Sequence, residues 1–188
     1  MGIQGSGLRV RSRKQHERTG FTLIELAVSM SILLIGIVSV VSATSRMHGL
    51  RKHNRERIIA FNGLRSMAER MSAQSFRLSR EDPETWSTEL LAIYGPGGTQ
   101  GDVFDVRGLN VDRGEENVGR ILFVTNETWT DADVGAQAAM PRDLNGDGDE
   151  NDPDVSADAR VLPVVLSLQW YGQSGSQTLD HVIYLTQY

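Results

Sequence analysis

The stretch RTGFTLIEL, residues 18–26, places the carboxylate of Glu25 at the front edge of the longest apolar run in the chain. Residues 26–45 (LAVSMSILLIGIVSVVSATS) contain no charged side chain, and as a helix they rise about 30 Å, which matches the hydrocarbon layer of a bilayer. A carboxylate costs about 2.5 to 3.5 kcal/mol at the centre of such a helix and less near its end. The stretch therefore predicts a membrane-spanning helix whose acidic residue needs a compensating partner.

The charged residues are divided into blocks along the chain. Arg and Lys dominate residues 1–20 and 46–80, whereas residues 81–188 are strongly acidic, and the formal net charge is −5. The basic blocks lack the patterns of nucleic-acid-binding modules, so we expect no nucleic-acid contact and instead a solvated helix face near inner-membrane lipid. The absence of Cys excludes disulfides, thiolate zinc sites and cysteine nucleophiles.

Three interpretations of the apolar run compete. A secretory signal peptide would be cleaved after Ala43, but the run exceeds the usual length of roughly 7 to 15 residues. A plain uncleaved anchor, with the basic amino terminus inside the cell, leaves Glu25 without a purpose. The third interpretation accounts for Glu25.

The segment TGFTLIEL resembles the cleavage and methylation motif of type IV prepilins and type II secretion pseudopilins, which is a basic leader ending in Gly, then Phe, three residues, Glu and a long apolar helix. The resemblance implies that a prepilin peptidase cuts between Gly20 and Phe21 and methylates the new amine of Phe21. It also implies that Glu25 lies beside the terminal amine of a neighbouring subunit in a filament. A buried carboxylate that is paired with an ammonium group costs much less than a lone one.

Two features resemble minor pilins and minor pseudopilins more than major subunits. Many major subunits carry a proline near the end of the membrane helix, around Ser42 here, but the first proline of this chain is Pro83. Many major pilins also close a carboxy-terminal loop with a disulfide, and this chain has no Cys.

These observations divide the chain into four parts. Residues 1–20 are the leader, 21–45 the transmembrane and filament-core helix, 46–80 its amphipathic continuation, and 81–188 an acidic, β-rich head in the periplasm or outside the cell. The continuation carries an apolar stripe at helical spacing that should cover a sheet. The stripe contains Ala60, Leu64, Met67, Ala68 and Met71.

Alternating hydrophobicity predicts the strands of the head. Short strands are expected at residues 103–107 and 120–125. At the carboxy terminus, alternation in residues 164–171 and 179–185 surrounds the turn sequence GQSGS, which predicts a β-hairpin. The predicted fold class is α+β, with a long amino-terminal helix packed on a small antiparallel sheet, as the resemblance to pilins also implies.

The acidic stretch DLNGDGDENDPD, residues 143–154, places oxygen ligands at the spacing of calcium loops in EF-hand and dockerin modules. It departs from them in being single, in ending with Asp, and in having Pro153 where an exit helix would begin. We expect a free-standing loop that binds a structural Ca²⁺, the alternative being a solvated acidic linker. The predicted ligands are Asp143, Asn145, Asp147, Asp149, Asn151 and Asp154.

No arrangement of catalytic residues is recognisable, and no organic cofactor is expected. His48 and His53 are spaced so that they do not share a helix face, and GQSGS lacks the G-x-S-x-G spacing of a nucleophile elbow. We expect a structural subunit and not an enzyme.

The expected protein spans the bacterial inner membrane once, with its head in the periplasm, or is part of a cell-surface filament. Its expected partners are prepilin peptidase, other pilin or pseudopilin subunits and, in a secretion system, the secreted cargo. The alternative is a membrane-anchored or secreted periplasmic binding module with a calcium-stabilised head, in which Glu25 is incidental.

Overall fold

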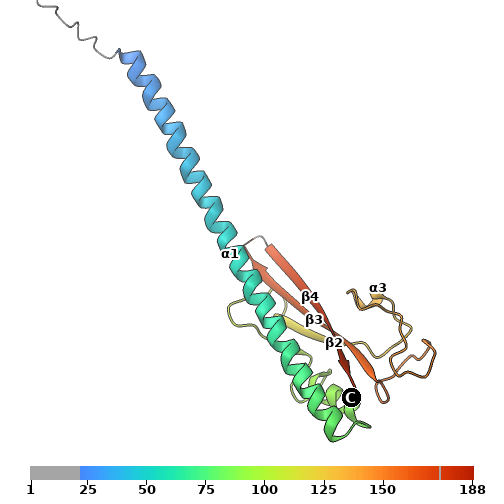
Figure 1. Ribbon diagram of the computed structural model, residues 1–188. Coiled ribbons are helices and arrows are strands. Elements are labelled where there is room, and N and C mark those ends of the chain that lie inside the picture. The colour runs from blue at the N-terminus through green and yellow to red at the C-terminus, as the bar shows by residue number, and fades with distance from the viewer. Residues whose placement is uncertain (1–21, 174) are drawn as a thin grey trace, which may run out of the picture. The chain divides into compact units, whose positions relative to one another are not determined.

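The computed structural model describes residues 22–173 and 175–188 (Figure 1). The leader and the predicted cleavage site at Gly20 and Phe21 lie outside the described residues, so processing there stays a prediction. The chain divides between Arg46 and Met47 into two units, which are treated separately below.

Helix α1, Leu23–Glu81, begins in the first unit and ends in the second. In the first unit, every described residue is exposed, including large apolar side chains such as Ile35 (65 % exposed) and Val40 (67 % exposed). By length and composition α1 is a candidate membrane span. It ends at Glu81, as expected from the bias of Pro83 against helical backbone at Asp82.

The second unit contains a four-stranded antiparallel sheet with strands in the order β1-β2-β3-β4. The strands are β1 (Val103–Phe104), β2 (Gly119–Phe123), β3 (Val161–Gly172) and β4 (Gly175–Thr186). The predicted carboxy-terminal hairpin is confirmed, since β3 pairs with β4 from Val161 opposite Thr186 to Gly172 opposite Gly175. The two predicted short strands are present as β1 and β2, and β1 is shorter than expected.

One apolar core joins the second part of α1 to the sheet. The predicted stripe is confirmed, because all five of its residues are buried in the same cluster as Leu166 and Leu168 of β3. Figure 1 shows residues 47–81 of α1 running along the sheet. The fold is therefore the predicted α+β arrangement of a long amino-terminal helix and an antiparallel sheet.

Two helices of the head were not predicted, namely α2 (Trp86–Tyr94) and α3 (Asp131–Val134). Helix α2 has a signal in the sequence, because Trp86, Leu90 and Tyr94 recur every four residues and are all buried. Helix α3 is a single turn that is held by a capping box between Thr130 and Asp133.

The carboxy terminus is tied to the last turns of α1. The Tyr188 N–H donates a hydrogen bond to Ser79 Oγ, and the Ser79 hydroxyl donates to the Tyr188 carbonyl oxygen over 3.1 Å. The Tyr188 ring also lies edge-on to Phe76, with 5.7 Å between ring centroids. These contacts fix the end of β4 against the helix.

Candidate functional site

The exposed apolar part of α1 is the first candidate site. The side chains of residues 23–41 are exposed along the whole segment, although most of them are Leu, Ile, Val or Met. A continuous apolar surface of this kind marks a membrane or protein contact and is not found on the solvated surface of a monomer. The segment therefore needs lipid or other helices around it.

Three hydroxyl side chains of the apolar part of α1 are satisfied within the helix. The hydroxyls of Ser31, Ser39 and Thr44 donate hydrogen bonds of 2.8 to 2.9 Å to the carbonyl oxygens four residues earlier. A hydroxyl that bonds to its own helix does not need water. These three residues are thus compatible with hydrocarbon.

Glu25 lies in the first turn of α1. Its backbone N–H donates a 3.3 Å hydrogen bond to Thr22 Oγ1, so Thr22 caps the helix in the Thr-x-x-Glu spacing of a capping box. An acidic residue in the first turn also interacts favourably with the helix dipole. None of the ion pairs among residues 22–173 and 175–188 includes Glu25.

The amino-terminal region matches a known family. The family model of the prokaryotic N-terminal methylation motif matches residues 16–41, which include Gly20, Phe21 and Glu25. Residues 16–41 thus carry a prepilin-type motif. The predicted resemblance to prepilin-type and pseudopilin-type proteins is thereby confirmed over these residues.

The match leaves the head of the chain unassigned. It ends at residue 41, before the boundary between the two units at Arg46 and Met47. No curated protein and no solved structure matches the chain. Any function of the head must therefore be argued from its own residues.

The acidic loop is the second candidate site, and its predicted ligands mostly bond to their own backbone. The Asp143 carboxylate accepts hydrogen bonds from the N–H groups of Gly146 and Gly148. Four other predicted ligands accept from the N–H two residues later: Asn145, Asp147, Asp149 and Asp154. These short-range bonds fold the loop on itself, and Asx turns of this kind are typical of Asp and Asn.

The structure brings together a different group of carboxylates, formed by Glu127, Asp149 and Asp152. One carboxylate oxygen from each residue lies within 4.8 Å of the other two. Asp149 was predicted as a ligand, whereas Glu127 and Asp152 were not. Of the predicted set, only Asp149 belongs to the group that the structure assembles from the described residues.

Glu127 lies between β2 and α3 and is fully buried. Its Oε1 accepts hydrogen bonds from the N–H groups of Leu144 and Asn145, and its own N–H donates to the Asp152 carbonyl oxygen over 3.0 Å. Its Oε2 is buried and has no hydrogen-bond partner in the part of the chain that the structure describes. Glu127 therefore connects both ends of the acidic loop to the sheet but leaves one charged oxygen unsatisfied.

The carboxylates of Glu127, Asp149 and Asp152 lie close together and repel one another. Burial and then the nearby carboxylates of Asp147, Asp149 and Glu127 raise the pKa of Asp152 above its ordinary value. The side chain of Arg160 lies beside the loop, where its Cδ is 3.3 Å from the position of a Cβ added to Gly146. Across the described ranges, however, no ion pair involves Glu127, Asp149 or Asp152.

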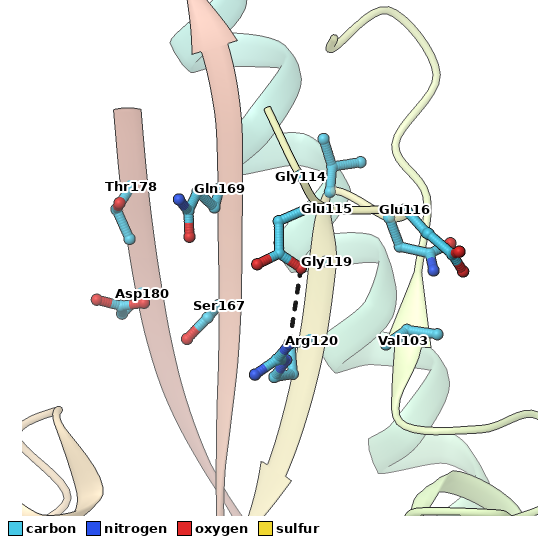
Figure 2. Close-up of a pocket in the computed structure, with 12 residues that line it drawn as sticks. Val103, Gly114, Glu115, Glu116, Gly119, Arg120, Ser167, Gln169, Thr178 and Asp180 are labelled. Atoms are coloured by element: carbon cyan, nitrogen blue, oxygen red, sulfur yellow. Dashed lines mark ion pairs between the residues drawn. The ribbon is translucent and has the colours of Figure 1, made fainter. Parts of the chain in front are cut away.

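A polar groove of about 600 Å³ crosses the outer side of the sheet (Figure 2). Figure 2 shows side chains of β2, β3 and β4 in front of the sheet, with the ion pair of Arg120 and Glu115 at 3.8 Å along one side. Its described lining contains carboxylates, hydroxyls and amides but neither His nor Cys.

Proposed function

We propose that this chain is a structural subunit of a type IV pilus or of a type II secretion pseudopilus. It is inserted once in the bacterial inner membrane, with the head in the periplasm, and is cleaved after Gly20 and methylated at Phe21. The observation that carries the proposal is the methylation motif at residues 16–41, within which the apolar side chains of α1 from Leu23 to Val41 are all exposed. Such a helix can exchange lipid for the helices of other subunits without exposing apolar surface to water.

Glu25 supplies the charge that selects the register of assembly. In a filament core, the carboxylate pairs with the amine of Phe21 in a neighbouring subunit. A buried ion pair gives little net stability, but a misplaced subunit leaves both charges unpaired in an apolar surrounding, which costs about 3 to 5 kcal/mol. Pairing therefore favours one arrangement of subunits over the others.

The sequence supports a minor subunit, and within that class it favours a pseudopilin. The chain has no proline before Pro83 and no Cys, in contrast to many major pilins, and residues 143–154 carry the predicted calcium-like loop. Its partners are then prepilin peptidase, the other subunits of the filament and, in a pseudopilus, the secreted cargo.

The decisive experiment is the mass of the amino-terminal peptide after expression in a host that has its own prepilin peptidase. We expect the chain recovered from membranes to begin at N-methylated Phe21. A chain that begins at Thr44 would identify a secretory signal peptide. A chain that still begins at Met1 would identify a plain anchor, and either result would contradict the proposal and support a membrane-anchored or secreted binding module.

A further inference from the structure

The buried Oε2 of Glu127 is an unsatisfied carboxylate oxygen in the head. Glu127 has 0 % exposure, its Oε2 has no hydrogen-bond partner among the described residues, and its carboxylate faces those of Asp149 and Asp152. A buried carboxylate oxygen without a partner is unfavourable, and nearby like charges increase the cost. Of these three residues, Asp149 is exposed and Asp152 half-buried, so the group opens to solvent on one side.

We propose that Glu127, Asp149 and Asp152 bind a divalent cation, Ca²⁺, which joins the acidic loop to the connection between β2 and α3. Two oxygens bound to one Ca²⁺ at about 2.3 to 2.6 Å lie at most about 5 Å apart. The three carboxylate oxygens already lie within 4.8 Å of one another. They are therefore close enough to share one ion.

The chemistry of the group favours Ca²⁺ over other metal ions. All three ligands are carboxylates, which are hard oxygen donors, and neither His nor Cys belongs to the group, so zinc and copper are disfavoured. Mg²⁺ requires near-ideal octahedral geometry, whereas Ca²⁺ accepts six to eight ligands at irregular positions. A loop of mostly exposed residues without regular secondary structure suits the more tolerant ion.

This site differs from the ligand set that the loop spacing predicts. In a calcium loop of the EF-hand type, the acidic side chain at the last position closes the site. That position is Asp154 here, and its carboxylate accepts a hydrogen bond from the Ser156 N–H, outside the group of three. Glu127 supplies the closing carboxylate from a segment that precedes the loop.

Bound Ca²⁺ would couple distant segments of the head. The backbone already joins the same segments, because the Glu127 N–H donates to the Asp152 carbonyl and the Val155 N–H donates to the Thr125 carbonyl over 2.8 Å. The cation removes the repulsion that opposes this pairing. The stability of the head should then depend on Ca²⁺.

The test is thermal unfolding of the full chain in detergent, followed by tryptophan fluorescence, with Ca²⁺, with Mg²⁺ and with EDTA. Sites of this class outside cells bind Ca²⁺ with Kd of about 10⁻⁴ to 10⁻³ M, so about 10 mM Ca²⁺ should raise Tm by about 4 to 8 °C relative to EDTA. Mg²⁺ should have a much smaller effect. Equal Tm values with Ca²⁺ and with EDTA would overturn the proposal.

Variants locate the ion. Glu127→Gln and Asp149→Asn should each weaken Ca²⁺ binding at least tenfold, whereas Glu150→Gln, an exposed acid of the same loop outside the group, should leave it unchanged. Asp149 is exposed, so Asp149→Asn tests the site even where Glu127→Gln does not fold. Loss of binding in Asp154→Asn together with normal binding in Asp149→Asn would place the ion on the EF-hand-like ligands and overturn the proposal. Neither the unfolding measurements nor the Ca²⁺-binding measurements depend on filament assembly. They can therefore contradict this site without contradicting the proposed function.

Discussion

At Gly63, the absence of a side chain lets α1 pack closely against the segment that follows β1. It lies in α1, between the buried residues Ala60 and Leu64. A Cβ added at Gly63 would lie 2.7 and 2.8 Å from the two methyl carbons of Val106. The segment after β1 can therefore pack directly on the helix backbone only because this position is glycine.

We predict that Gly63→Ala destabilises the head, although Ala is the better helix former by about 1 kcal/mol. The clash with Val106 should outweigh that gain, since overpacking costs about 1 to 3 kcal/mol. The matched control is Gly49→Ala, whose Cβ would meet only the flexible Gln173 side chain at 3.4 Å or more. Denaturant unfolding of the full chain in detergent should show Gly63→Ala less stable than the parent, and Gly49→Ala as stable or more stable. A stabilised Gly63→Ala would contradict the packing argument.

At the scale of elements, α1 is a single helix with two kinds of surface. The part in the first unit has no buried residue, whereas the part in the second unit buries one stripe in the core. Both surfaces were predictable, because an uninterrupted apolar run and a stripe at helical spacing are local patterns. The end of the helix was predictable from Pro83 alone.

The shorter elements were harder to predict because distant residues define them. Strand β1 is only Val103–Phe104, and its partner residues Gly119 and Arg120 come later in the chain. Gly119 also makes room for the Phe104 ring, which would lie 2.6 Å from an added Cβ. Alternation within one segment cannot reveal where its partner strand ends.

The proposed role of Glu25 belongs to the scale of elements. Glu25 lies in the first turn of α1, and its charge is expected to set how the apolar part of that helix packs in a filament. We predict that Glu25→Gln is still cleaved and methylated at Phe21 but does not assemble. The amide keeps the backbone bond to Thr22, so the start of the helix is retained, but the neighbouring ammonium loses its counter-charge. Leaving one charge of a buried pair alone costs about 3 to 5 kcal/mol.

The measurement is the amount of sedimentable filament, with the amino-terminal peptide mass as proof of processing. Glu69→Gln is the control, because Glu69 is an exposed acid of the same helix whose 2.8 Å pair with Arg65 is worth only about 0.3 to 0.5 kcal/mol. This variant should assemble normally. Normal filaments from Glu25→Gln would show that Glu25 has no role in assembly and would support the binding-module alternative.

At the scale of the whole molecule, the two candidate sites differ in how far the sequence could define them. The methylation motif is contiguous, so the residues that carry it are adjacent in the chain. The group of Glu127, Asp149 and Asp152 is not contiguous. Glu127 comes close to Asp149 and Asp152 only when the connection between β2 and α3 pairs with the acidic loop. Loop spacing thus indicated the region of the proposed cation site but not the buried Glu127 that belongs to it.

The division at Arg46 and Met47 gives the last prediction, that residues 47–188 fold without the preceding segment. All buried residues of the described chain lie in this second unit, and its core joins α1 to the sheet without a side chain from residues 22–46. Removing residues 1–46 also removes the exposed apolar helix surface that would otherwise demand detergent. The fragment should therefore be a soluble monomer by analytical ultracentrifugation, with sharp near-ultraviolet circular dichroism and cooperative urea unfolding. An expanded state that binds hydrophobic dye and lacks near-ultraviolet signal would mean that the head depends on the membrane helix for its packing.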